Sequence, residues 1–295
     1  KGEDSVEDRP AYASGDDGAV ASSQGVCETA TMLIGRIAAQ LYRAASALRG
    51  RAHGRDGAVG SPVWLWPALR AMLLHGGYHV LVAMRTTGGP DMHFFAALSL
   101  VGLGMAWLTS LVGARGRMSA LGVVVFPLAA LLLAVYHGYG HEPSKLLGWR
   151  LASHAWLALL AYATLSIAAL LAIMLWLQER ALRRREFRPW LRALPPLADL
   201  EALLFRVITV GFALLTLTLV TGVLFVDDLL AQKLVHKTVL SVLSWIVFGV
   251  LLIGRRRYGW RGAKAVHWTL SAMLLLLLAF FGSQFVIELV FGHTR

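Results

Sequence analysis

The sequence is poor in cysteine and in charged residues, and each shortage excludes a class of protein. A single cysteine, Cys27, stands among the 295 residues. One thiol cannot form an internal disulfide, a Cys-x-x-Cys redox pair or the Cys-x-x-Cys-His site to which c-type cytochromes attach haem. Charged residues make up 15% of the chain and hydrophobic residues 57%. A water-soluble domain of this length could not bury so much apolar surface.

Motifs for nucleotide chemistry and zinc proteolysis are also missing. The chain has no Walker loop, no Gly-x-Gly-x-x-Gly behind a strand and no His-Glu-x-x-His. On a soluble protein, the net charge of +11 would suggest nucleic-acid binding. Here the basic residues lie between long apolar runs, where they orient a membrane protein against anionic headgroups. We therefore expect contact with a lipid bilayer and not with nucleic acid.

Long apolar runs are what the sequence has in abundance. A bilayer core of roughly 30 Å needs about 20 helical residues, and only helices and closed barrels satisfy their backbone in lipid. The runs are leucine-rich and do not alternate, so they favour helices. We predict an all-α fold, a polytopic helical membrane protein with seven or eight transmembrane helices. The clearest spans are 63–84, 92–112, 118–137, 152–177, 203–225, 235–254 and 266–291.

The first 62 residues differ from the rest. Residues 1–31 are polar and rich in Gly, Ser and Asp, and are expected to be a disordered or artefactual tail. Residues 32–49 place Leu33, Ile37 and Leu41 near one helical face, which predicts an amphipathic helix or a weak first transmembrane helix. A basic linker completes the segment 32–62, and residues 63–295 are expected to form the transmembrane domain.

Lysine and arginine are distributed unevenly between alternate loops, and this distribution predicts the orientation. Sixteen lie on one side of the predicted spans and five on the other. The richer side is expected to be cytoplasmic, which places the C-terminus outside. The sixteen are Arg49, Arg51, Arg55, Arg115, Arg117, Arg180, Arg183, Arg184, Arg185, Arg188, Arg192, Arg255, Arg256, Arg257, Arg261 and Lys264; the five are Arg85, Lys145, Arg150, Lys233 and Arg295.

Several histidines gather on the side opposite the arginines. His154 and His236 each open a predicted span that enters from the outside, so both imidazoles are expected at similar depth. Two histidines at matching depth on different helices suit bis-imidazole coordination of a haem iron. Each of them alone is also explained as an ordinary interfacial residue. His93 and His293 are expected near the same face.

Four further histidines allow structural interpretations. His137 and His141 flank Gly-Tyr-Gly and could form a transition-metal site with His154, but solvated loop residues are the favoured interpretation. His75 and His79 are four residues apart within the span 63–84. Ionisable groups inside a membrane suggest function, yet neutral histidines hydrogen-bonded to a neighbouring helix are slightly favoured.

Dispersed motifs resemble a known family. They occur in the same order and spacing as in the cytochrome c assembly membrane-protein family, the CcsA/HemX-like group, and are closest to its short YpjD-type branch. The likeness covers residues 92–291 and implies a bacterial inner-membrane protein that handles haem at its outer, periplasmic face during cytochrome c maturation. The motifs are His154-Ala-Trp-Leu-Ala-Leu-Leu-Ala-Tyr162-Ala-Thr, Gln178-Glu179-Arg180, Leu203-Leu204-Phe205-Arg206, His236-Lys237-Thr238, Trp245 and Phe281-Gly282-Ser283.

The resemblance implies a role for some histidines of this chain, while other histidines of the family have no counterpart here. His154 matches the family's first external haem-ligand histidine, and His236 lies where the tryptophan-rich external motif would end. That motif itself is absent, and the family's membrane histidine falls at Ile253. Its second external histidine falls at Phe291, two residues before His293. The likeness thus implies haem contact, with His154 and His236 as candidate iron ligands, rather than haem attachment to a substrate. His93 and His293 are further cofactor-binding candidates.

Two other functions stay open. A non-catalytic regulator of tetrapyrrole metabolism, like the HemX-like relatives, would dock partners through the basic loop 178–202. A small-molecule transporter ranks last, because no inverted repeat or pair of broken spans marks a midplane site. On the favoured hypothesis the partners are the bilayer, haem and other cytochrome c maturation proteins, and enzymatic turnover is not implied.

Overall fold

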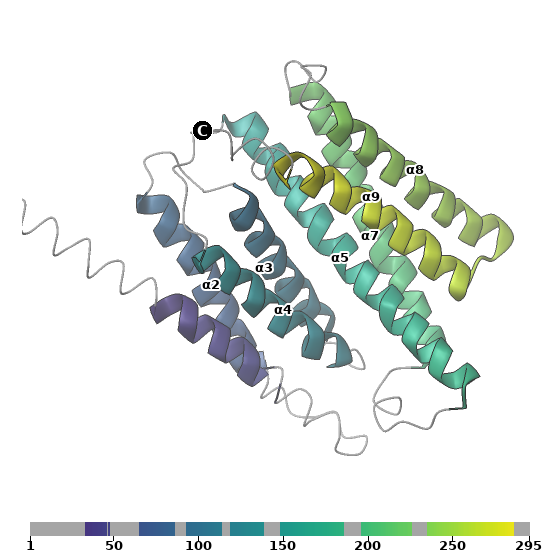
Figure 1. The fold of residues 1–295 in the computed structure, drawn as a ribbon, viewed down its shortest axis with the longest axis horizontal. Helices are drawn as coiled ribbons and strands as arrows, with labels where there is room; N and C mark the ends of the chain where they lie inside the picture. Colours follow the sequence, from purple (N-terminus) through teal and green to yellow (C-terminus); the bar gives the residue numbers. More distant parts are fainter. Residues whose placement is uncertain are drawn as a thin grey trace, which may run out of the picture.

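The computed structural model is helical throughout the part of the chain that it describes (Figure 1). It describes residues 33–45, 47, 65–85, 93–113, 119–138, 148–185, 196–225 and 235–285. A helix at 33–45 is followed by α2 (Leu65–Arg85), α3 (Phe94–Gly113), α4 (Ser119–Gly138), α5 (Trp149–Arg183), α7 (Leu197–Phe225), α8 (Val235–Tyr258) and α9 (Ala263–Phe285). These ranges contain no strand, and the all-α prediction is confirmed. The predicted tail 1–31 lies outside them.

Six of these helices are long and apolar enough to cross a membrane, namely α3, α4, α5, α7, α8 and α9. At a rise of about 1.5 Å per residue, the 35 residues of α5 and the 29 of α7 extend about 52 and 44 Å. Both exceed a hydrocarbon core of roughly 30 Å, so each helix extends beyond it at one end at least. The chain is a polytopic helical membrane protein, as predicted.

The remaining predicted span, α2, is not among these six helices. It is 21 residues long but carries Arg70, His75 and His79, which lower its apolar character. The helix at 33–45 adds Tyr42 and Ala45 to an apolar cluster with α2, α3 and α4. Buried polar residues of α2 therefore face neighbouring helices.

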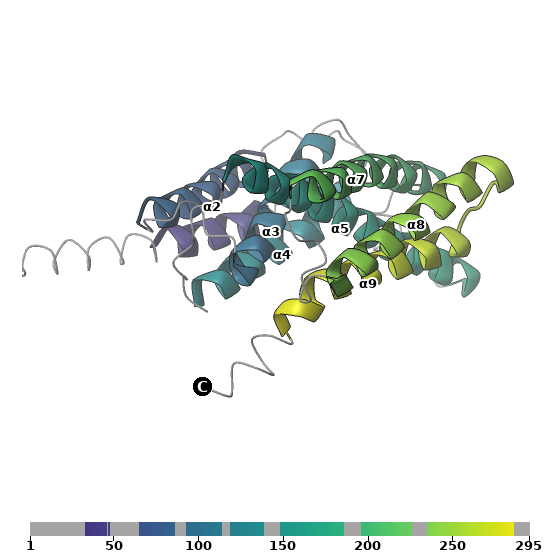
Figure 2. The same cartoon turned by 90° about the horizontal axis from the view of Figure 1, so that it is seen from above.

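Helix α5 lies between two groups of helices (Figures 1 and 2). The helix at 33–45 groups with α2, α3 and α4 on one side of α5, and α7, α8 and α9 lie on the other. Helix α5 packs against α7, α3 and α9, and α8 packs against α9. One apolar core runs through both groups, with Leu165, Leu171 and Leu175 of α5 fully buried within it. The central position of α5 makes it the scaffold of the bundle.

Two glycines allow α3 and α7 to approach α5 closely. A β-carbon added to Gly104 of α3 would lie 2.9 Å from the β-carbon of Ala163. One added to Gly211 of α7 would lie 2.5 Å from Cδ2 of Leu165. Helices in membranes associate through packing of small residues, since apolar side chains gain nothing by leaving lipid for one another. These contacts fix α5 between its neighbours.

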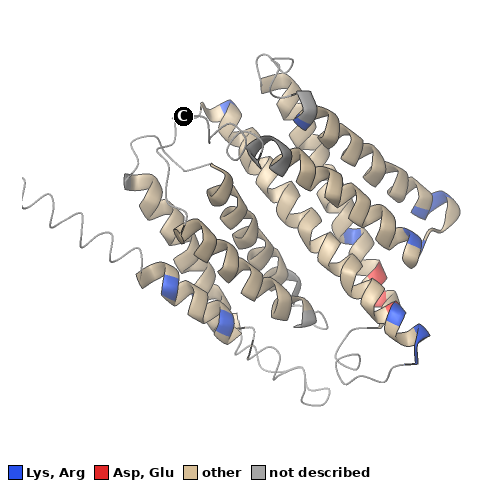
Figure 3. Ribbon diagram, viewed as in Figure 1, with Lys and Arg blue, Asp and Glu red and all other residues tan. Residues whose placement is uncertain are grey.

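Basic residues concentrate at one end of the bundle (Figure 3). Helix α5 ends there with Arg180 and Arg183 in its last turn, and α8 ends with Arg255, Arg256 and Arg257. Helices α7 and α9 begin at this end, which we call the arginine-rich end. At the opposite end α5 and α8 begin, and α7 and α9 end (Figure 1). The positive-inside rule predicts that the arginine-rich end faces the cytoplasm.

Candidate functional site

His154 lies at the opposite end of the bundle, in the second turn of α5, and packs on α7. It is half-buried. The imidazole lies beside Gly222, where an added β-carbon would be 3.2 Å from Cε1 and 3.7 Å from Nδ1 of His154. Glycine at this position therefore makes the space into which the ring fits. His154, Thr221 and Gly222 together are called the His154 site below.

Hydrogen bonds at the His154 site define which ring nitrogen is available. Nδ1 of His154 is 3.1 Å from Oγ1 of Thr221. The Thr221 hydroxyl can donate to the carbonyl of Leu217 at 2.9 Å or of Thr218 at 3.0 Å. Its oxygen then accepts the Nδ1–H of His154, which leaves the lone pair on Nε2. We assign this tautomer from the network. The carbonyl of Thr218 is a second acceptor for the His154 ring. A neutral imidazole that keeps the lone pair of one nitrogen can ligate a metal.

Aromatic and cationic side chains lie at the same ends of α5 and α7 as this site. Trp149 and Phe225 form a tilted aromatic pair with ring centroids 6.1 Å apart. Arg150 places its guanidinium 5.5 Å from the centre of the Trp149 ring and is exposed. Residues four apart lie on one helical face, so Arg150 shares a face of α5 with His154. The end of α5 thus presents an imidazole, an aromatic surface and a cation together.

Of the other predicted ligands, only the side chain of His93 belongs to the described structure. His236 lies in the first turn of α8, at the same end of the bundle as His154, but its side chain is outside the described residues. His293 also lies outside them. His93 belongs to another group of side chains, with its ring centroid 5.7 Å from that of Tyr136 on α4. The pairing of His154 with His236 therefore stays a prediction.

A second polar cluster, on helices 33–45, α2 and α3, was only partly foreseen from the sequence. The hydroxyl of Tyr42 lies 3.3 Å from Nδ1 of His75. Oγ of Ser99 is 2.9 Å from Nε2 of His75 and 3.0 Å from Nε2 of His79. One hydroxyl can donate to one imidazole and accept from the other, so Ser99 links two neutral histidines of complementary tautomer. The favoured interpretation, histidines hydrogen-bonded to a neighbouring helix, is confirmed.

Stacked rings extend this cluster to α4. The ring of His79 lies between that of His75, with centroids 5.5 Å apart, and that of Tyr136, at 4.8 Å and nearly parallel. The hydroxyl oxygen of Tyr78 lies 2.9 Å from Nδ1 of His137. His137 is half-buried in the last turn of α4, so the expectation of a solvated loop residue is wrong for it. Its hydrogen bond to Tyr78 links the end of α4 to α2.

No group of three or more His, Cys, Asp or Glu that could hold a metal ion occurs among the described residues. The alternative of a metal site on His137, His141 and His154 stays untested, because His141 lies outside those residues. The four-residue spacing of His75 and His79 was the available sequence signal for the second cluster. Its partners Tyr42 and Ser99 lie on other helices, and no local pattern identifies them.

Comparisons with known proteins agree with the helical architecture. The profile of the family "Cytochrome C assembly protein" matches residues 65–291. The chain is 32% identical to "Inner membrane protein YpjD" of Escherichia coli K12 over 210 residues, covering 68% of this chain and 77% of the relative. It is 33% identical to "Protein HemX" of Brevibacillus brevis, covering 45% of this chain and 49% of the relative.

A more distant relative carries a functional name. "Cytochrome c biogenesis protein CcsA" of Parasynechococcus marenigrum is 24% identical, with 60% of this chain and 65% of the relative covered. No solved structure matches. The inner-membrane relative and the six apolar helices indicate a multi-pass inner-membrane protein. The family match spans the whole described bundle from α2 onward, and the chain belongs to the cytochrome c assembly protein family.

Proposed function

We propose that the protein handles haem in cytochrome c-type biogenesis, at the end of the bundle that carries His154. Nε2 of His154 would ligate the haem iron, and His236 of α8 would supply the second imidazole. The positive-inside rule predicts that this end faces the periplasm, with the C-terminus outside. The role in cytochrome c biogenesis rests on membership of the family and on the printed name of the CcsA relative.

One observation carries the assignment of His154. Its Nδ1 lies 3.1 Å from the Thr221 hydroxyl, and the Thr218 carbonyl is a second acceptor beside the ring, so α7 orients the imidazole. Metal-ligating histidines commonly donate their second ring N–H to an acceptor, which fixes the tautomer and the orientation of the ring. The bond to Thr221 does this for His154 before any ligand binds.

The surrounding residues fit the group. Gly222 leaves the space that a β-carbon would fill beside the imidazole. Trp149 and Phe225 offer apolar ring surface to a porphyrin, and Arg150 offers a cation to a propionate. Bound haem would supply an iron that accepts imidazole nitrogens and changes oxidation state. The protein residues bind and orient the group, and none of them is assigned a catalytic step.

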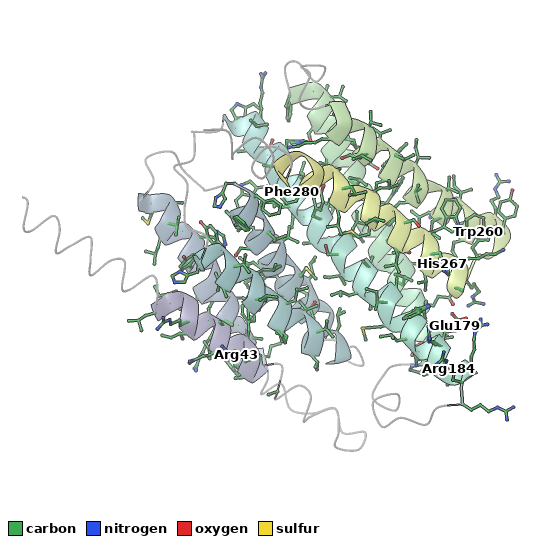
Figure 4. The ribbon with its side chains drawn as sticks, viewed as in Figure 1. Arg43, Glu179, Arg184, Trp260, His267 and Phe280 are labelled. Carbon is green, nitrogen blue, oxygen red and sulfur yellow. The ribbon has the colours of Figure 1, made fainter. Side chains whose placement is uncertain are left out.

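The experiment is an absorption spectrum of the full chain purified in detergent, oxidised and then reduced. We expect a Soret band and sharp reduced bands in the wild type and their loss in His154→Ala/His236→Ala. His267→Ala is the matched control, because His267 is an exposed helix histidine at the arginine-rich end (Figure 4). It should keep the spectrum of the wild type.

Two results would contradict the proposal. A wild-type protein that stays colourless after addition of haem would show that no haem site forms. Retention of the haem spectrum by His154→Ala/His236→Ala would show that other residues ligate the iron. Either result should be read only after circular dichroism has shown equal helix content in all variants.

A regulator of tetrapyrrole metabolism is the second candidate, favoured by the similarity to the protein named HemX. In that case partners would dock on the basic loop at the arginine-rich end. Deleting residues 183–192 would then abolish partner capture, and substituting His154 would leave it unchanged. If haem binding is lost in the His154 variants and kept in the deletion variant, the first proposal is favoured instead.

A further inference from the structure

A groove opens between α7 and α8 near the arginine-rich end. Its volume is about 260 Å³, and it is open to the surroundings. This is smaller than the roughly 300–1,000 Å³ of pockets that enclose drug-sized ligands, so it suits a headgroup rather than a whole porphyrin. The lining residues are Ala202, Phe205, Arg206, Thr209, Leu252, Arg255 and Arg256.

One of the three arginines in the groove is fixed by the fold. Arg255 donates to Oε1 of Glu201 at 2.6 Å and to the carbonyl of Trp260 at 3.2 Å. Its guanidinium also lies 4.7 Å from the centre of the Phe205 ring. Arg261 donates to the same oxygen of Glu201 at 3.0 Å. Glu201 is buried and shared between two arginines, so this triad keeps an excess positive charge beside the groove.

The other two arginines have no counterion in the described structure. Arg206 and Arg256 are exposed, and neither makes a hydrogen bond or ion pair with a described residue. They line the groove from α7 and from α8. Two unpaired guanidinium groups beside a third that is already fixed form a site for a phosphate, since arginine binds phosphate oxygens through charge-assisted hydrogen bonds.

The position of the groove along the bilayer normal favours a ligand that is itself part of the membrane. Arg206 is nine residues, about 14 Å, from the start of α7. This is the length by which α7 exceeds a hydrocarbon core of roughly 30 Å. With Phe225 at the opposite boundary of the hydrocarbon, Arg206 lies at the boundary between hydrocarbon and headgroups. On the hydrocarbon side, Val210 of α7 and Ile253 of α8 are exposed apolar residues, 55% and 59% accessible.

We infer that this groove binds the phosphate headgroup of an anionic phospholipid. Arg206 and Arg256 contact the phosphate, and Arg255 contributes charge from the wall. The acyl chains run along the apolar surface of α7 and α8. Basic pockets between transmembrane helices near one membrane surface are known to bind anionic lipid headgroups. The apolar surface next to the groove favours a lipid over free phosphate, which has no apolar part to bury.

The test uses the full chain in a neutral detergent and native mass spectrometry. Wild-type protein is titrated with phosphatidylglycerol, with phosphatidylcholine and with inorganic phosphate. We expect phosphatidylglycerol to bind at least about tenfold more tightly than phosphatidylcholine, and inorganic phosphate to compete only weakly. In Arg206→Gln/Arg256→Gln, affinity for phosphatidylglycerol should fall by about tenfold or more, since each arginine contributes to the attraction.

Two further variants separate the groove from overall charge and from folding. Arg185→Gln/Arg257→Gln removes two exposed arginines outside the groove and should bind phosphatidylglycerol as the wild type does. Arg206→Lys/Arg256→Lys keeps the charge and should retain most of the affinity. Equal binding of the two lipids, or an equal loss in both glutamine variants, would overturn the inference. Inorganic phosphate that displaces the lipid at equal concentration would overturn the assignment to a lipid.

Discussion

Replacing Gly222 by alanine perturbs the His154 site without removing any of its polar groups. The new β-carbon would lie 3.2 Å from Cε1 of His154, closer than the roughly 3.5–4.0 Å that two carbon atoms prefer. The imidazole must therefore shift by a few tenths of an ångström or rotate. Either movement disturbs the 3.1 Å hydrogen bond between Nδ1 and Thr221.

The expected effect on haem binding is larger than the effect on stability. Loss of the partner that orients a metal-ligating histidine costs about 10–100-fold in metal affinity. We therefore expect haem affinity to fall by about tenfold in Gly222→Ala. Alanine is favoured over glycine inside a helix by about 0.5–1 kcal/mol, which offsets the strain of the new contact. The unfolding temperature should consequently remain equal to that of the wild type or rise.

The assay is a haem titration followed by absorbance, together with thermal unfolding of the same preparations. Gly77→Ala is the matched control, because Gly77 lies inside α2 and an added β-carbon there meets nothing within 4 Å. It should gain stability and leave haem affinity unchanged. Wild-type haem affinity in Gly222→Ala, with an unaltered spectrum, would refute the reasoning that His154 is held there as a ligand.

Three further substitutions test the packing of the bundle. Gly211→Val should destabilise the fold by about 1–3 kcal/mol through overpacking, because even one β-carbon would lie 2.5 Å from Cδ2 of Leu165. An unchanged unfolding temperature would contradict the close approach of α5 and α7. Glu201→Gln should cost about 1–3 kcal/mol in urea unfolding, since its buried carboxylate accepts hydrogen bonds from two partly exposed arginines. A neutral result would mean that the ion pairs contribute nothing. Ser99→Ala should cost about 1–3 kcal/mol by leaving the buried imidazole of His75 and the half-buried imidazole of His79 without their shared hydroxyl. Equal hydrogen exchange of α2 and α3 in variant and wild type would argue against that link.

The helices themselves could be predicted from the sequence because each apolar run is long enough to span a bilayer. The ends were less predictable. Helix α5 continues to Arg183, six residues beyond the predicted span, where Arg183 pairs with Glu179 one turn earlier. Such polar turns carry no hydropathy signal. The location of His154 near the end of a span could be predicted, because His154 stands at the start of an apolar run in the sequence.

The contacts of the candidate sites could not be predicted, because they depend on the rotation of each helix about its axis. Neither Thr221 nor Gly222 is marked by a local pattern as a neighbour of His154, which lies 67 residues before Thr221. Glu201 and Arg255 are 54 residues apart, and the sequence placed Arg255 in a loop of orienting charges. Only the packing of α7 on α8 makes that arginine part of a groove.

The coordination of ferric haem in the loaded protein tests the central claim most directly. Electron paramagnetic resonance of the wild type should give a low-spin signal typical of two imidazole ligands. In the haem-loaded His154→Ala variant, the ferric signal should be high-spin. In His267→Ala it should match that of the wild type. A low-spin signal that persists unchanged in His154→Ala would contradict the assignment of His154 as an iron ligand.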